Sequence, residues 1–314
     1  MSELSDTEII QRIRQVKIDT NVDREYVNNR LDKFTITKID GSASINVRCS
    51  LRELLNIFYA SDNEAYLTNM KELYGHVFKY GEIIQELPVE HIVVKKCKIT
   101  SKEWNYIKRY DFTSTGIVIT ICSTDSGNDK CFITGITAAY IINVLDEDCD
   151  IQQNMCFNIT FRGIAVKLDK VSKDHLLLMA KSLKALPDII LSRRIILQQF
   201  IDIAGCDVNN RYCIACVKFI PLLQSIYSKH RCCLCGYNVC RKCIFKKKIF
   251  KNNQYLQSSF CTKCIVRINY CDYSDIDLNV DSYKKIVPDL DNYNAGQRVF
   301  NYLIASIEKD WSTS

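Results

Sequence analysis

Residues 213–264 read CIACVKFIPLLQSIYSKHRCCLCGYNVCRKCIFKKKIFKNNQYLQSSFCTKC, and this stretch decides the fold of the C-terminal part of the chain. It contains four Cys-x-x-Cys pairs: Cys213/Cys216, Cys232/Cys235, Cys240/Cys243 and Cys261/Cys264. A Cys-x-x-Cys turn places two thiolates on one side of a tight backbone loop, so two such turns complete a tetrahedral site of four sulfurs for zinc. Four pairs in so short a stretch are a specific signal. They predict two bound zinc ions.

The spacing allows two ways for the four pairs to share two metals. Joining the first pair to the second, and the third to the fourth, would give two zinc ribbons in sequence. Joining the first to the third, and the second to the fourth, would interlock the two sites. Only residues 236–239 separate the second pair from the third. This short joint favours the interleaved arrangement, which would hold together a domain whose apolar core is too small to fold unaided.

The same residues resemble a FYVE-type finger. The likeness lies in Cys213-x-x-Cys216, in the run Lys229-His230-Arg231-Cys232-Cys233-Leu234-Cys235-Gly236, and in the last two pairs, with Asp207 at the acid of the family's leading Trp-x-x-Asp motif. The resemblance implies a treble-clef, cross-brace module with two interleaved zinc ions. It also implies binding of phosphatidylinositol 3-phosphate on endosomal membranes.

The sequence departs from the FYVE pattern at three places. Ala204 stands where the family has its Trp, residues 228–231 replace its Arg-Arg-His-His, and Ser259-Phe260 lacks the arginine before the last pair. These departures fall on lipid-binding positions, so the resemblance supports the fold more than the lipid specificity.

The chain of 314 residues is long enough for one large domain and one small one. The sequence has no apolar run of about twenty residues, so no transmembrane helix is predicted. Its start is polar, so no signal peptide is predicted. About half of the seventeen cysteines lie in metal-spaced pairs, which fits reduced thiols in cytosol or nucleus. We expect an α+β domain over residues 1–204, the double-zinc module over 205–268, an acidic linker over 269–295 and a C-terminal amphipathic helix over 296–314.

Basic charge is concentrated on the zinc module. Residues 205–269 hold twelve Lys/Arg and one acid, whereas residues 270–314 hold eight acids and four bases. An isolated lysine run is usually a solvated face, but a metal scaffold that gathers the charge attracts anionic membrane, phosphoinositide, RNA or DNA. A short basic cluster is also typical of a nuclear import address. The residues expected to bind such a ligand are Lys229, His230, Arg231, Arg241, Lys242, Lys246, Lys247 and Lys248.

An apolar segment lies between the first and second cysteine pairs. Its apolar residues are Phe219, Ile220, Leu222, Leu223 and Ile226, and a basic run follows directly. In FYVE-type fingers the corresponding loop inserts into the bilayer while basic residues meet the headgroups, and burial of apolar area plus attraction to anionic lipid would support this here. Packing of these side chains against the preceding domain is the alternative.

The first 204 residues predict a mixed α+β domain. The capping boxes Ser5-x-x-Glu8 and Ser50-x-x-Glu53 each open a helix. Further helices are expected over residues 23–34, 62–78, 173–186 and 188–203, and a hairpin over 35–47 that turns at Asp40-Gly41. Strands are expected over residues 92–94, 117–122, 131–133, 157–161 and 164–168.

The sequence contains no motif that supports catalysis. It has no Gly-rich phosphate loop, no Gly-x-Ser-x-Gly elbow and no His-Glu-x-x-His, and its four histidines are scattered. We therefore expect a protein that is not an enzyme. A RING-type ubiquitin ligase is the specific enzymatic alternative, since it also uses interleaved zinc pairs. That family usually carries a histidine ligand, whereas all eight ligands here are cysteines.

As a whole chain, the sequence resembles the baculovirus major early zinc-finger protein family in its α+β body, its Cys213-x2-Cys216-x15-Cys232-x2-Cys235 spacing and the basic stretch beside it. The resemblance implies an early viral protein that moves between the nucleus and assembly sites at the plasma membrane.

We expect a non-enzymatic zinc-binding adaptor in the cytoplasm, at the periphery of the plasma membrane and in the nucleus. Its basic module would attach to anionic membrane or to a membrane partner, while the sequence names no protein partner for the N-terminal domain. The alternative is a zinc-dependent regulator that binds nucleic acid through phosphate contacts.

Overall fold

The computed structural model describes residues 4–16, 34–36, 40–60, 62–113, 115–124, 132–145, 155–166, 170–201, 210–221, 231–251, 254–271 and 273. These residues form two compact units that divide within helix α5 (Leu186–Ile196). The first unit runs to Ile190 and includes Tyr273, and the second runs from Leu191 to Cys271. The first is α+β, as predicted. The predicted boundary after residue 204, most of the linker and the whole C-terminal helix lie outside the described residues and stay predictions.

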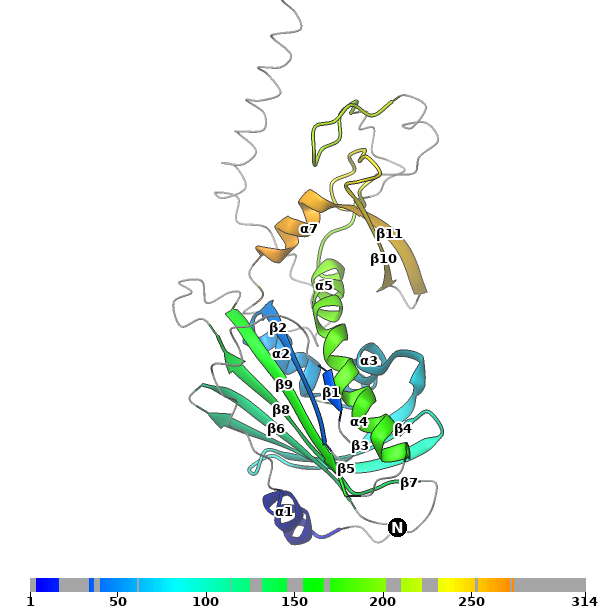
Figure 1. Ribbon diagram of the computed structural model, residues 1–314. Coiled ribbons are helices and arrows are strands. Elements are labelled where there is room, and N and C mark those ends of the chain that lie inside the picture. Colours follow the sequence, from blue (N-terminus) through cyan, green and yellow to red (C-terminus); the bar gives the residue numbers. More distant parts are fainter. Residues whose placement is uncertain are drawn as a thin grey trace, which may run out of the picture. The chain divides into compact units, whose positions relative to one another are not determined.

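One sheet organises the first unit (Figure 1). Its order is β1-β2-β9-β8-β6-β5-β4-β3, with every neighbour antiparallel, and β7 adds a short parallel pair to β5. The strands are β1 (Phe34–Ile36), β2 (Asp40–Cys49), β3 (Phe78–Leu87), β4 (Ile92–Ile99), β5 (Lys102–Thr113), β6 (Gly116–Ser123), β7 (Phe132–Ile133), β8 (Ile136–Val144) and β9 (Met155–Ala165).

Helices cover both faces of this sheet. The helices α2 (Leu51–Phe58), α3 (Asn63–Tyr74) and α4 (Lys170–Ser182) lie on one side, and α1 (Asp6–Arg14) lies on the other (Figure 1). Short 3-10 turns, η2 (Gly75–Val77) and η3 (Leu183–Ala185), follow α3 and α4. The side chains of a strand alternate between the two faces, so each strand of the sheet's centre contributes to both packing layers.

The main core lies between the sheet and the helices α2, α3 and α4. It includes Trp104, Phe157 and Phe161, each at most 1% exposed. A smaller core forms on the other face, where Ile9 and Ile13 of α1 pack over residues of β4, β5 and β6. Burial of these apolar side chains is the main favourable contribution to the folding of this unit.

Several sequence predictions for this unit need correction. The predicted hairpin exists, but Asp40 and Gly41 are already paired within β2, with Gly41 opposite Ile36, so they do not form its turn. The helix expected over residues 62–78 ends at Tyr74, and Phe78 begins β3. The last predicted helix ends at Ile196 instead of 203. The sequence analysis missed β3, β5 and β8. The helix expected over residues 23–34 lies outside the described residues except Phe34, which begins β1.

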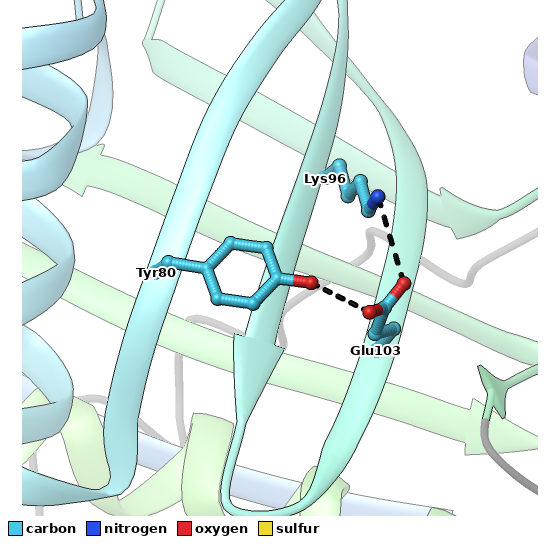
Figure 2. A network of polar contacts seen from close by, with 3 residues as sticks. All are labelled: Tyr80, Lys96 and Glu103. Carbon is cyan, nitrogen blue, oxygen red and sulfur yellow. Dashed lines mark hydrogen bonds and ion pairs between the residues drawn. The ribbon is translucent and has the colours of Figure 1, made fainter.

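A polar network crosses three strands on an exposed part of the sheet (Figure 2). Tyr80 of β3 donates its hydroxyl hydrogen to Glu103 of β5 over 2.6 Å, and the Lys96 amine of β4 lies 3.6 Å from the same carboxylate. The hydrogen bond to Glu103 raises the pKa of Tyr80 to about 12. Each of these cross-strand contacts adds a few tenths of a kcal/mol up to about 1 kcal/mol and helps fix the strand register.

Both predicted capping boxes are present. In the first, Glu8 N donates to Ser5 Oγ (3.4 Å) and Ser5 N to the Glu8 carboxylate (2.9 Å). In the second, Glu53 N donates to Ser50 Oγ (3.2 Å) and Ser50 N to the Glu53 carboxylate (2.8 Å). The two differ in burial: the first is exposed, whereas the second is buried. The Ser50 hydroxyl also donates to the Tyr273 carbonyl over 3.2 Å.

None of the helices in the described residues has both the length and the apolar composition that crossing a membrane requires.

The two capping boxes form a matched pair for a stability experiment. We expect Ser50→Ala to lower the free energy of unfolding of the first unit by about 2 kcal/mol, because it removes a helix cap and leaves a buried carbonyl without its donor. Ser5→Ala removes only an exposed cap and should cost about 1 kcal/mol or less. Denaturant unfolding followed by the emission of buried Trp104 measures both, and equal losses would contradict the prediction.

Candidate metal centre

The structure gathers the eight paired cysteines into two groups of four. The first site comprises Cys213, Cys216, Cys240 and Cys243, and the second site comprises Cys232, Cys235, Cys261 and Cys264. Within each site all four sulfurs lie within 4.8 Å of one another. The first pair thus joins the third, and the second joins the fourth. This grouping is the interleaved arrangement that the short joint between the second and third pairs favoured.

The distances between sulfurs match those of a tetrahedral zinc site. Cys216 Sγ lies 3.6 Å from Cys240 Sγ, and Cys235 Sγ lies 3.9 Å from Cys261 Sγ. Four sulfurs placed at the usual Zn–S distance of about 2.3 Å in a tetrahedron stand roughly 3.8 Å apart. Both groups can therefore hold a metal ion, and a set of four thiolates is compatible with zinc.

The first two cysteine pairs lie on turns with the same hydrogen bonds. In the first turn, Val217 N donates to Cys213 O (2.8 Å) and Cys213 N to Lys218 O (2.8 Å). In the second, Gly236 N donates to Cys232 O (2.8 Å) and Cys232 N to Tyr237 O (3.0 Å). These bonds turn the backbone so that both thiols of a pair face the same point. Each turn therefore presents half of a metal site.

The last two pairs are positioned by one hairpin and one helix. Cys243 directly precedes β10 (Ile244–Lys251), and Cys261 ends β11 (Gln254–Cys261). The register pairs Ile244 with Cys261, so the base of this hairpin carries ligands for both sites. Cys261 then caps α7 (Thr262–Asn269) by accepting a hydrogen bond from Cys264 N over 3.2 Å. The shared hairpin is the reason that the two sites interlock.

Electrostatics favours a cation in each site. Burial, followed by hydrogen bonds with Cys216 and Cys240, raises the pKa of Cys243 to about 12. Four sulfurs this close repel one another as thiolates, and the thiolate is the form that ligates metal. A divalent cation removes the repulsion and releases the protons, so metal affinity should rise with pH until the thiols are ionised.

The two sites differ in exposure and in backbone strain. In the first site Cys216, Cys240 and Cys243 are half-buried, whereas all but Cys235 are buried in the second. The residue after each turn has a positive φ: Gly236 at 76° and Val217 at 59°. A β-branched residue pays for this left-handed conformation, and glycine does not. The first site is therefore the more accessible and the more strained.

An asparagine pair joins the two turns and was missed in the sequence analysis. Asn238 N donates to Asn210 Oδ1 (2.7 Å), and Asn210 Nδ2 donates to Asn238 O (3.0 Å). Phe200 also packs edge-on against Phe260 of β11, and Ile201 N donates to Cys233 O (2.9 Å). Asn210 and Phe200 lie outside any cysteine spacing, so no sequence signal marked them.

The apolar residues proposed for membrane contact differ in burial. Phe219 is 57% exposed and stacks edge-on against Tyr212, whereas Ile220 is only 4% exposed and donates its amide hydrogen to Arg211 O. Ile220 therefore belongs to the interior of the module. The other three, Leu222, Leu223 and Ile226, lie outside the described residues.

The basic residues that are predicted to bind an anionic ligand also differ in exposure. The exposed ones are Arg241, Lys242, Lys246 and Lys248, Arg231 is half-buried, and Lys247 is buried. Lys246 and Lys248 share one face of β10 because strand side chains alternate, and this alternation turns Lys247 to the other face. Lys229 and His230 lie outside the described residues.

Comparison with known proteins does not assign this chain to a family. No family model and no curated protein matches it. The human StarD13 (DLC2) lipid transfer and protein localization domain has a TM-score of 0.34 and 9% identity, covering 60% of this chain and 98% of that one. Human STARD10 has a TM-score of 0.34 and 9% identity, covering 61% and 81%. The Zhui aromatase/cyclase from Streptomyces sp. R1128 has a TM-score of 0.31 and 11% identity, covering 50% and 94%. Similarities of this size support no conclusion about fold or function.

Metal content tests the ligand assignment. We expect two zinc ions per wild-type chain and only one in Cys240→Ser, because that change removes a ligand of the first site. Cys233→Ser is the matched control, since Cys233 lies in neither group, and it should keep both ions. Elemental analysis of the purified proteins measures this directly. A wild-type value of one or none, or loss of zinc from Cys233→Ser, would contradict the assignment.

The strain at Val217 predicts unequal metal release. A chelator should remove zinc in two phases, with the first site emptying faster. Val217→Gly should slow that phase roughly fivefold, which corresponds to about 1 kcal/mol of relieved left-handed strain. The reciprocal change Gly236→Ala should speed the slow phase. Release can be followed with a colorimetric zinc indicator, and identical kinetics in all three proteins would refute this account.

Proposed function

We propose that this chain is a non-enzymatic adaptor whose double-zinc module attaches to anionic membrane, or to a partner there, through a basic surface. The observation that carries the proposal is the grouping of exposed bases beside the two metal sites. Arg241 and Lys242 lie within the third cysteine pair, and Lys246 and Lys248 follow on β10. Metal binding therefore places four cations on a short rigid segment, and a rigid cluster attracts polyanions more strongly than flexible lysines do.

A FYVE-like finger is the finer form of this proposal. The interleaved grouping of the cysteines supports it, and phosphoinositide is the ligand that the resemblance implies. Phe219, which is 57% exposed, would add apolar contact at the membrane surface. The departures at residues 228–231 and at Ser259-Phe260 make a broader preference for anionic lipid the simpler expectation.

The second candidate is a zinc-dependent regulator that binds nucleic acid. The same exposed bases favour it, because lysine and arginine neutralise phosphates in a sequence-independent way. The viral early-protein resemblance would place both activities in one chain, at membrane assembly sites and in the nucleus, and it stays a prediction from the residues. A RING-like ubiquitin ligase has the least support, since both four-sulfur groups consist of cysteine alone.

A double variant tests the basic surface. Lys246→Gln/Lys248→Gln should weaken binding to liposomes containing anionic lipid by about tenfold or more, at roughly 1 kcal/mol per lysine. The control Lys173→Gln/Lys181→Gln removes the same charge from exposed positions on α4 and should leave binding unchanged. Sedimentation with vesicles measures both. If both double variants lose vesicle binding equally, net charge alone explains the effect and the basic surface of the module has no specific role.

Salt dependence separates the two candidate functions. Binding to duplex or single-stranded nucleic acid should fall linearly on a log–log plot against salt, with a slope that drops when bases are removed. Membrane binding with apolar insertion should instead leave a salt-resistant remainder. Tight, salt-sensitive nucleic-acid binding without vesicle binding would favour the regulator.

The apolar loop can be tested on its own. Leu222→Asp/Leu223→Asp should abolish the salt-resistant part of vesicle binding, because burial of two leucines in the bilayer contributes roughly 3–6 kcal/mol at most. Both zinc ions should stay bound. If these leucines pack on protein instead, the same variant should lose several kcal/mol of stability and keep its vesicle binding. Vesicle sedimentation and thermal unfolding of the same protein distinguish the outcomes.

A further inference from the structure

Two lysines lie in the core of the first unit. Lys95 of β4 is 2% exposed and Lys108 of β5 is 8% exposed. The register places Lys95 opposite Tyr106 and Lys108 opposite Val93, so both amines are on the sheet face that carries the main core. Lysine is almost never this buried unless its charge is paired.

The contacts of these amines are aromatic rings and one carbonyl. Lys95 Nζ lies 4.5 Å from the ring centre of Tyr66. Lys108 Nζ donates to Phe58 O over 2.5 Å and lies 5.2 Å from the ring centre of Tyr110. Neither amine has an ion-pair partner among the described residues. Cation–π contacts offset only part of the cost of burying two positive charges.

The bases next to Lys95 and Lys108 in the sequence lie on the outer face of the sheet, and they do have ion-pair partners. Lys96, next to Lys95, pairs with Glu103 at 3.6 Å, as Figure 2 shows. Arg109, next to Lys108, pairs with Asp111 at 2.8 Å. Successive strand residues point to opposite faces, so these two outer bases have ion-pair partners, whereas neither inner amine has one among the described residues. The charge of Glu86 on β3 acts on Lys95 and raises its pKa, but burial outweighs this effect. The described part of the inner face therefore lacks a carboxylate that is paired with either amine.

Hydroxyl groups and an unpaired imidazole lie on the same side. Tyr66 and Tyr106 share a hydrogen bond of 3.0 Å between their hydroxyls. Trp104 stacks on Tyr106 at 4.1 Å between ring centres and meets His175 edge-on at 4.3 Å. The fully buried Nε2 of His175 has no hydrogen-bond partner among the described residues. Buried polar atoms are rarely left unpaired, and such an atom calls for an explanation.

We propose that the first unit binds a small organic carboxylate, with its carboxylate group between the Lys95 and Lys108 amines and its apolar part against the aromatic rings around them. Two ammonium groups form charge-assisted hydrogen bonds to a carboxylate. An interior lined mainly by aromatic groups with a few convergent polar ones is the usual composition of a small-molecule site. This binding is separate from the zinc module.

The electrostatics of the two amines agree with this geometry. Burial lowers the pKa of Lys95 to about 8, and burial and then the charge of Lys95 lower the pKa of Lys108. A carboxylate between them would reverse both shifts, because an opposite charge favours the protonated amine. The ligand would thus restore the charge that burial suppresses.

The test is thermal unfolding of the full zinc-loaded chain with three probes: octanoate, octanol and inorganic phosphate. Octanoate should raise the melting temperature saturably, by several degrees at concentrations well above its dissociation constant. Octanol carries the same apolar body without the charge and should have little effect. A rise with inorganic phosphate alone, an equal rise with octanol, or no rise with octanoate would each overturn the proposal.

Matched variants locate the site. Lys95→Met and Lys108→Met should each abolish the octanoate effect, and without ligand they should be as stable as wild type or more so, because an uncompensated buried amine is removed. Lys96→Met and Arg109→Met change the paired outer bases and should keep the effect. An octanoate response that survives in both inner variants would refute the site. Should an inner variant fail to fold, the three-probe titration of the wild type still decides.

Discussion

The close approach of four cysteine sulfurs in each of two groups is the constraint on which the second unit depends. Its described residues bury few large apolar side chains, chiefly Ile195, Ile220, Val239, Ile249, Phe260 and Ile268. Each site brings four sulfurs within 4.8 Å of one another, and such a group repels itself once ionised. A metal ion bound by the four thiolates would remove that repulsion. Metal binding and folding are therefore expected to form one equilibrium.

The first unit folds on a different basis. Its sheet buries a continuous apolar layer under three helices, with Trp104, Phe157 and Phe161 almost fully enclosed. The exceptions to this layer are therefore informative. Lys95 and Lys108 break the pattern of apolar residues facing inward, and such local conflicts in an otherwise consistent fold are expected at functional sites.

Metal coordination and surface charge are coupled through one hairpin. The base of β10 and β11 carries cysteines of both four-sulfur groups, and the alternation along β10 sets which lysines face outward. Lys246 and Lys248 are exposed beside the metal sites, whereas Lys247 turns inward. A change in metal occupancy would therefore also change the arrangement of the charges proposed to meet a polyanion. This links the stability of the module to its proposed binding function.

Features that depend on residues close together in the chain could be predicted from the sequence. They are the four cysteine pairs, the preference for interleaving, and the two capping boxes, whose hydrogen bonds join residues three apart. The sequence pattern missed β5, in which the charged Lys108 interrupts the aromatic residues that share one face of the strand, and it misplaced the first turn because Asp40-Gly41 imitates a hairpin signal inside β2. Only the tertiary structure decided that Lys95 and Lys108 face the core, that Val217 adopts the conformation of Gly236, and that Asn210 joins the two turns. These facts arise from contacts between residues far apart in the chain, which local pattern and propensity do not encode.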